Sequence, residues 1–342
     1  MSITPKENFL RLLRHDTPTW FGNPWDCFNL TPEGKPSVPD AVSLYVGRPA
    51  KGETGYTDRF GVVWDFPADQ PGPTPSTDPA RKVIRDIACW REYFDFPPLD
   101  GLPWDQALAM SGTLDRENKL VMCASPRGMF EFSHAMMGFE DALVNYIVEP
   151  ESVAELLGAY ADWKIAAAKE VIDVMRPDII LNHDDWGSKD KLFLPPAVWR
   201  VVVRPAYEKF YGYLKSRDVL IMHHCDCYAQ DLATDMVELG IDIWQGPTPE
   251  NDLRAVAEAT RGRLFLLGGI DMSYIDFPDI PEDRVRDHIR RVIEQYAPLG
   301  CFLPCYTSIR PVHDRVMVIG NDEMARRGAL YMGTHPGNHA GS

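Results

Sequence analysis

The sequence VLIMHHCDC, residues 219–227, joins an apolar run to two histidines and two cysteines. The apolar run predicts a buried β-strand, in which alternate side chains point to the same face. His223 and Cys225 would therefore share one face, together with Cys227 if the strand extends that far. His224 would lie on the other face. A histidine and a cysteine that project together from a strand end are favourable ligands for zinc, which binds imidazole and thiolate groups in tetrahedral geometry.

Short apolar runs alternate with longer amphipathic stretches from about residue 118 onward. Six of the short runs predict strands, at residues 120–123, 179–181, 219–222, 241–244, 263–267 and 301–304. The longer stretches predict helices, among them residues 196–215, 229–239, 253–259, 285–296 and 323–331. Repeated strand–helix units are typical of a parallel sheet in an α/β protein.

Two further strands, near residues 20–25 and 61–64, would complete a (β/α)8 TIM barrel. A doubly wound open sheet is the alternative, but no Gly-x-Gly-x-x-Gly turn follows the first strand. Residues 32–80 are rich in proline and glycine, which predicts an elaborated N-terminal loop region without a core of its own. We therefore expect a single barrel domain over residues 1–342.

Composition restricts the partners that this chain can have. The formal net charge of −15 argues against general binding of nucleic acid or anionic membranes. No apolar stretch approaches the roughly 20 residues that a membrane-spanning helix needs, and the first residues lack the apolar core of a signal peptide. Seven scattered cysteines suit reduced thiols better than a disulfide framework, so we expect a cytoplasmic protein.

Residues that follow barrel strands face the active site in a TIM barrel. This rule gathers polar and aromatic side chains that lie far apart in the sequence: Trp25, Asp26, Arg127, Glu131, Asp184, Asp185, Gln245 directly after Trp244, Asp271 and Cys305. Cys305 is thereby the best third metal ligand beside His223 and Cys225. The fourth position would be taken by Cys227, by Glu131, or by water or substrate.

The remaining polar residues of this set have a chemical and a structural interpretation. Asp184 and Asp185, with Glu131 nearby, suit proton transfer or ligand orientation. Adjacent acids at a strand end can equally cap the following segment. We predict substrate contacts for Trp25, Asp26, Arg127, Trp244 and Gln245, although tryptophans at such positions also serve as packing.

Several longer segments resemble one known family. These are TPKENFLRLLRHDTPTW, TDRFGVVWDF, SPRGMFEFSHAMMGFEDALVNYIVEPE, DDWGSKDKLFLPPAVWRVVVRPAYEKF, ELGIDIWQG and LGGIDMSYIDFP, which together extend over most of the chain. They are similar to motifs of the uroporphyrinogen decarboxylase superfamily and of its corrinoid-linked methyltransferases. The resemblance implies a (β/α)8 barrel with its cleft at the carboxyl ends of the strands.

The resemblance favours the methyltransferase branch. True decarboxylases of this superfamily carry an N-terminal arginine-rich motif that grips substrate carboxylates, and the equivalent residues 22–28 here, GNPWDCF, contain no arginine. The methyltransferases hold zinc through His-x-Cys and a later cysteine, which His223, Cys225 and Cys305 match. Some relatives have serine in place of cysteine, so metal dependence varies within the branch. The resemblance thus implies a zinc enzyme that exchanges a methyl group between a small substrate and a corrinoid (methylcobalamin) on a separate protein.

An aryl methyl ether, demethylated at oxygen, is the favoured substrate. Three alternatives stay open. The chain could methylate a coenzyme M-type thiol, whose sulfonate would need an arginine or lysine nearby. It could be a metal-free decarboxylase, similar to uroporphyrinogen decarboxylase, that acts on a smaller acid or a tetrapyrrole. It could also be a non-enzymatic barrel that binds a corrinoid protein and contains a structural zinc.

Overall fold

A computed structural model describes residues 3–16, 21–32, 34–70, 72–307 and 313–334 of the chain. Its centre is a parallel sheet of six strands, which are hydrogen-bonded in sequence order. The strands are β4 (Met122–Ala124), β5 (Ile179–His183), β6 (Leu220–His224), β7 (Ile243–Gln245), β8 (Phe265–Ile270) and β9 (Phe302–Tyr306). Nearly all of their residues are buried, as expected for parallel strands that are covered on both faces. The six strands predicted in the second part of the chain are therefore confirmed.

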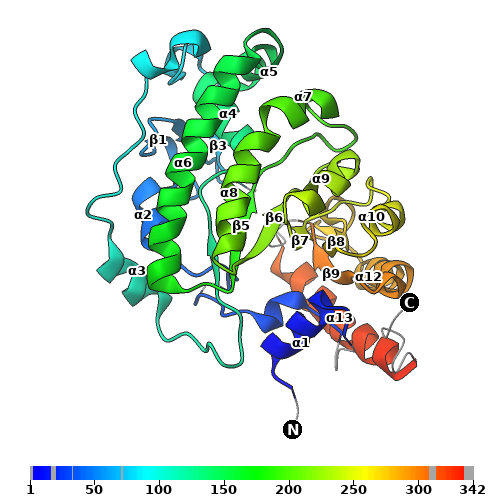
Figure 1. The fold of residues 1–342 in the computed structure, drawn as a ribbon. Coiled ribbons are helices and arrows are strands. Elements are labelled where there is room, and N and C mark those ends of the chain that lie inside the picture. The colour runs from blue at the N-terminus through cyan, green and yellow to red at the C-terminus, as the bar shows by residue number, and fades with distance from the viewer. Residues whose placement is uncertain (1–2, 17–20, 33, 71, 308–312, 335–342) are drawn as a thin grey trace.

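Helices follow each strand and flank the sheet (Figure 1). The α-helices are α1 (Pro5–Leu13), α2 (Ala41–Val46), α3 (Trp104–Ser111), α4 (Met129–Met137), α5 (Phe139–Val148), α6 (Pro150–Met175), α7 (Pro196–Val202), α8 (Arg204–Ser216), α9 (Ala233–Glu238), α10 (Leu253–Thr260), α11 (Met272–Ile275), α12 (Glu282–Tyr296) and α13 (Asp314–Thr334). The short 3₁₀ helices are η1 (Pro24–Cys27), η2 (Pro79–Arg81), η3 (Ile87–Glu92), η4 (Gln230–Leu232) and η5 (Ala297–Leu299). None of the helices in the described ranges combines the length and the apolar character that crossing a bilayer requires.

One predicted helix is divided in two. The expected helix over residues 196–215 is split between α7 and α8 at Val203. Pro205 explains the break, because proline has no N–H to donate and its ring clashes with the preceding turn of a helix. The predicted helix over residues 229–239 likewise begins with the 3₁₀ turn η4 before α9.

The prediction of a barrel strand near residues 61–64 was wrong. This segment contributes β2 (Val63–Asp65), which lies between β1 (Thr54–Thr57) and β3 (Thr74–Pro75) in a separate antiparallel sheet. A tight turn closed by Gly61, at φ +81°, returns the chain directly onto β1. This local pairing takes the place of a distant pairing with the barrel.

The other predicted N-terminal strand is replaced by a short 3₁₀ helix that fills the seam between the two edge strands. Residue 20 lies outside the described residues, and Pro24 opens η1. Phe28 then forms a parallel bridge with Leu120, just before β4, while η1 packs against β9. The Leu120 N–H donates to Cys27 O at 2.8 Å. The first segment of the chain thus lies against both edges of the six-stranded sheet.

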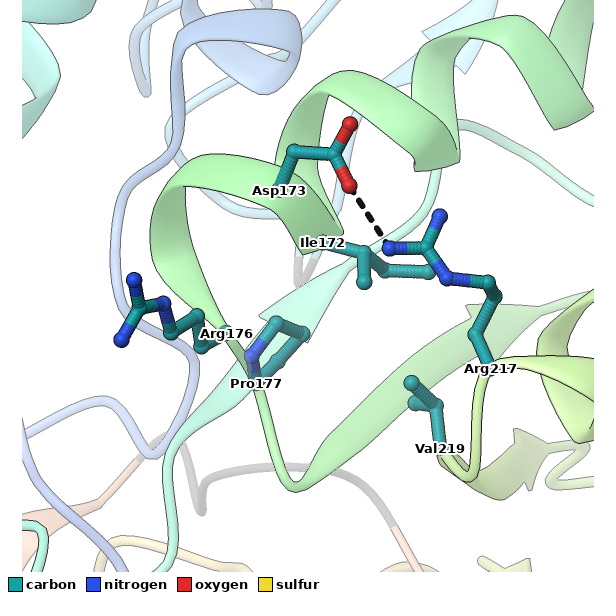
Figure 2. Close-up of a pocket in the computed structure, with 6 residues that line it drawn as sticks. All are labelled: Ile172, Asp173, Arg176, Pro177, Arg217 and Val219. Atoms are coloured by element: carbon teal, nitrogen blue, oxygen red, sulfur yellow. Dashed lines mark hydrogen bonds and ion pairs between the residues drawn. The ribbon is translucent and has the colours of Figure 1, made fainter.

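The two ends of the sheet differ in character. At the amino ends of β5 and β6, a hollow of about 350 Å³ is lined by Ile172, Asp173, Arg176, Pro177, Arg217 and Val219. Figure 2 shows this hollow bordered by the ion pair between Asp173 and Arg217, whose oxygen and nitrogen lie 2.6 Å apart, with the Arg176 side chain turned away. None of the predicted functional residues lines it. Those on β4–β9 and in the segments after them lie instead at the carboxyl ends of the strands, whereas Trp25 and Asp26 lie beside Lys119 and Leu120, before β4 begins.

Candidate active site

The two histidines of β6 point to opposite sides of the sheet, as strand alternation predicts. His223 lies against the helices: its Nδ1 is 2.8 Å from the hydroxyl of Tyr211 on α8, and its ring lies 4.3 Å from that of Trp186. Its Nε2 is 3.2 Å from the carbonyl oxygen of Asp184. Both ring nitrogens of His223 are therefore engaged by protein atoms in a fully buried environment.

The structure does not bring His223, Cys225 and Cys305 together as one ligand set. Within the described ranges, three groups have ligand atoms within 4.8 Å of one another: Asp185, Cys225 and Cys227; Glu131, His183 and Asp185; and Asp185, His224 and Asp226. The physical reason is that the face of β6 bearing His223 is the one covered by α8, whereas Cys305 lies beside Gln245, with Sγ 3.8 Å from Nε2.

Two thiols form the most metal-like of these groups. The sulfur atoms of Cys225 and Cys227 are 3.1 Å apart, and the backbone N–H of Gly187 donates to Cys227 Sγ at 3.1 Å. Burial, together with the neighbouring Cys227, raises the pKa of Cys225 well above its ordinary range. Two thiols and the Asp185 carboxylate are a donor set that fits zinc, and binding would release the thiol protons.

Asp184 is an anchor for α4. Its carboxylate accepts hydrogen bonds from the backbone N–H groups of Phe130 and Glu131, at 3.0 and 2.7 Å. It also accepts from Trp186 Nε1 at 2.8 Å and from the Tyr207 hydroxyl at 2.5 Å. Burial, with the charge of Glu131, raises the pKa of Asp184 to about 6. With four donors around it, Asp184 caps α4, an earlier helix and not the following segment that the sequence suggested, and it holds Glu131 in position.

An ion pair between Glu131 and His183 occupies the centre of the site. Their closest oxygen and nitrogen are 2.9 Å apart, and the His183 side chain is 43% exposed. Burial opposes both charges, but each partner stabilises the other, so the pKa of Glu131 falls to about 2 and that of His183 rises to about 10. Burial, with Asp226 and Glu131 nearby and against the effect of His183, raises the pKa of Asp185 to about 8.

Sequence reasoning missed His183, and it placed His224 on the face opposite His223 without giving it a role in the site. His183 is the last residue of β5 and the register partner of His224, and their rings stack at 4.4 Å. Strand alternation could have found His183, because it shares a face with Ile179 and Leu181 of the same apolar run. Gln245 on β7, a predicted site residue, is the register partner of His224 and completes this group.

The other predicted substrate contacts divide into two kinds. Arg127 reaches the site region with a side chain that is 22% exposed, pairs with Asp58 at 3.2 Å and stacks on Trp64 at 3.6 Å. Trp25 and Trp244 are buried packing residues, and the Trp244 indole donates to Cys225 O at 2.9 Å. Asp26 lies exposed on η1, where its backbone carbonyl accepts from Lys119.

A buried lysine supports the loop that carries Arg127. Lys164 of α6 is 1% exposed, and its ammonium group donates to the carbonyl oxygens of Pro126 and Arg127 and to Asn182 Oδ1. Burial lowers the pKa of Lys164 well below its usual range. This side chain ties the segment after β4 to β5 and so fixes the approach to the site.

Comparison with known proteins agrees with this architecture. A sequence model of the uroporphyrinogen decarboxylase (URO-D) family matches residues 111–319. No curated protein matches the chain. A solved structure of a methyltransferase from Methanosarcina mazei superposes with a TM-score of 0.59 over 94% of this chain and 99% of that one, at 14% sequence identity. At this identity the likeness concerns the fold, and both comparisons imply the predicted (β/α)8 TIM barrel.

Proposed function

Because this chain belongs to the uroporphyrinogen decarboxylase (URO-D) family, we propose that it is a methyltransferase of that superfamily, which exchanges a methyl group between a small substrate and a corrinoid on a separate protein. The observation that carries the proposal is the site itself. A half-exposed histidine, ion-paired with a partly buried glutamate, lies beside a buried pair of thiols at the carboxyl ends of the strands. The fold shared with the methyltransferase from Methanosarcina mazei supports it.

The residues suited to holding zinc are Asp185, Cys225 and Cys227, because their ligand atoms converge. These take over the role that the sequence predicted for His223, Cys225 and Cys305. A zinc ion in this position would supply Lewis acidity toward a substrate oxygen, while the corrinoid on the partner protein would carry the methyl group. Cys305 and Gln245 border the same region and would contact the substrate.

The favoured methyl donor is an aryl methyl ether. Removal of its methyl group leaves a phenolate oxygen, which needs a proton or a positive charge close by. His183 would donate that proton: it is the half-exposed member of the ion pair, and Glu131 holds its Nδ1 and orients the ring. Asp184 would serve indirectly, because its bonds to the N-terminus of α4 fix Glu131.

A second candidate is methylation of an anionic thiol of the coenzyme M type. Arg127 and Arg48 favour it, because they stack on Trp64 and Phe66, at 3.6 and 5.9 Å. Burial and the charge of Arg127 lower the pKa of Arg48, which makes no ion pair within the described residues. A substrate sulfonate or carboxylate would pair with Arg48 and share Arg127 with Asp58.

The test is an anaerobic assay with zinc-loaded protein, cob(I)alamin and a methoxyphenol, followed through the absorbance of methylcobalamin. We expect turnover by the wild type, a loss of about 100-fold or more in Cys225→Ser, and no change in the control Cys89→Ser. Turnover only in the reverse direction, from methylcobalamin to 2-mercaptoethanesulfonate, would favour the thiol substrate. Failure of the zinc-loaded protein in both assays would contradict methyl transfer.

A further inference from the structure

The imidazole of His224 has a fixed tautomer that leaves one nitrogen bare. Gln245 Nε2 donates to the backbone carbonyl of Tyr306 at 3.2 Å, and since a carbonyl only accepts, the amide orientation is settled. Gln245 Oε1 must then be the acceptor that faces His224 Nδ1. Nδ1 therefore carries the proton and Nε2 presents its lone pair. The side chain of His224 is 3% exposed.

The bare nitrogen faces carboxylates. Asp226 Oδ2 lies 3.8 Å from His224 Nε2, too far for a hydrogen bond, and Nε2 makes no hydrogen bond within the described part of the chain. Asp185 joins the group, and the ligand atoms of the three residues lie within 4.8 Å of one another. The backbone N–H of Asp226 donates to Asp185 Oδ1 at 2.9 Å, which leaves Oδ2 available. One imidazole nitrogen and two carboxyl groups thus lie close enough together to bind one cation, which would displace any proton held by Asp185.

The neighbouring group of Glu131, His183 and Asp185 lacks this property. Glu131 and His183 form an ion pair at 2.9 Å, in which the protonated imidazole has no lone pair for an ion and the charge of the carboxylate is already balanced. A buried imidazole whose Nδ1–H is held by an amide oxygen is the usual arrangement of a metal-binding histidine. Among the oxygen and nitrogen groups, the one around His224 is therefore the one prepared for a cation.

We infer that Asp185, His224 and Asp226 form a second divalent-cation site, next to the thiol pair and joined to it through the shared Asp185 carboxylate. Imidazole and carboxylate ligands suit Mn²⁺, Fe²⁺, Co²⁺ or Zn²⁺, whereas the thiols select a softer ion. Asp226 is 39% exposed, so an ion can enter from solvent. Gln245 is the positioning residue of this site. The inference concerns metal binding and does not depend on methyl transfer.

The test uses Mn²⁺ alone, because this ion prefers oxygen and nitrogen ligands. The full chain is titrated, and free Mn²⁺ is measured by electron paramagnetic resonance. We expect about one Mn²⁺ per chain, retained in the double variant Cys225→Ser/Cys227→Ser. Binding should weaken about 10- to 100-fold in Gln245→Leu and more in Asp226→Asn, and stay unchanged in Asp69→Asn, which alters an exposed turn. Circular dichroism checks that each variant folds.

Two results would overturn the inference. One is the absence of saturable Mn²⁺ binding by the wild type, and the other is binding that Asp226→Asn and Gln245→Leu leave unchanged. A parallel titration with Co²⁺ separates the two sites, because only thiolate ligation gives an intense sulfur-to-cobalt charge-transfer band. If that band is absent while Mn²⁺ binds, the second site stands and the thiol site fails. Failure of the methyl-transfer assay affects neither readout.

Discussion

The imidazole rings of His183 and His224 stack at a centroid distance of 4.4 Å, because the two residues are register partners at the ends of β5 and β6. Their surroundings give them opposite charge states. Although burial opposes it, Glu131 raises the pKa of His183 to about 10, whereas burial and the charge of His183 lower that of His224 to about 4. At neutral pH His183 is therefore a protonated donor, whereas His224 is neutral and offers a lone pair at Nε2.

Replacing Glu131 with glutamine should lower the pKa of His183 from about 10 toward that of a free imidazole, because burial is then opposed only by the weaker effects of Asp185 and Asp226. The measurement is the pH titration of the histidine ring signals by NMR. The matched control is Glu140→Gln on the exposed surface of α5. An unchanged His183 titration would contradict the ion pair.

The same pair predicts how stability depends on pH. The folded-state pKa of His183 is raised from 6.5, so its contribution is complete below pH 6.5 and is lost as pH rises through about 10. The folded-state pKa of Glu131 is lowered from 4.5, so the contribution is also lost as pH falls through about 2. The difference in unfolding free energy between wild type and Glu131→Gln should therefore shrink above about pH 10. Urea denaturation across this range measures it.

Gly128→Ala should destabilise the fold by about 2–4 kcal/mol. A methyl group at position 128 would overlap the carboxylate of Asp184 and meet the Tyr207 hydroxyl at 2.6 Å. Gly158→Ala in the middle of α6 is the control, since nothing lies within 4 Å of its added carbon. That change should stabilise the protein by about 0.5–1 kcal/mol through helix propensity. Equal effects of the two substitutions in chemical denaturation would refute the close approach of α4 to Asp184.

Lys164→Met should cost about 3 kcal/mol, because Pro126 O and Asn182 Oδ1 lose a buried charged donor, while Arg127 O keeps only the Tyr160 hydroxyl. Lys169→Met removes only an exposed ion pair with Asp173 and should change stability by less than about 0.5 kcal/mol. Urea unfolding measures both. A similar small loss in both variants would mean that the loop after β4 does not depend on Lys164.

When the folded protein is treated with iodoacetamide, Cys89 should be alkylated first. Cys89 is the one partly exposed thiol of the seven, and the others are buried. Burial also raises the pKa of Cys305 to about 12, which suppresses its thiolate form. Mass spectrometry of the peptides gives the order of modification. Labelling of Cys305 as fast as that of Cys89 would show that the site opens to reagents of this size.

The regular strands could be predicted from the sequence because each is a short apolar run buried on both faces, as in residues 263–267 and 301–304. The N-terminal third could not. The alternation around Trp64 identifies a strand, but it does not say which sheet the strand joins, and the turn at Gly61 decides that locally. Pro205 marked the break between α7 and α8 and was overlooked.

The site shows the same division. Alternation correctly separated His223 from His224, but it cannot tell which face the helices cover. The tertiary contacts decide it: Tyr211 of α8 contacts His223, and Gln245 of β7 contacts His224. The roles of Asp184 and Asp185 were likewise left open by the sequence. Only the position of α4 distinguishes the two residues, because its N-terminus donates to Asp184 and not to Asp185.

The seam filled by η1 has a consequence for biosynthesis. Phe28 bridges to Leu120 on one side of the sheet, while Phe21 packs on Tyr331 of α13 with ring centroids 5.2 Å apart. Segments that lie far apart in the sequence therefore meet, and the sheet cannot be completed until β9 has left the ribosome. A nascent chain in this state exposes an unpaired strand edge. Its yield in cells should thus depend more on chaperones and on translation speed than the stability of the finished protein would suggest.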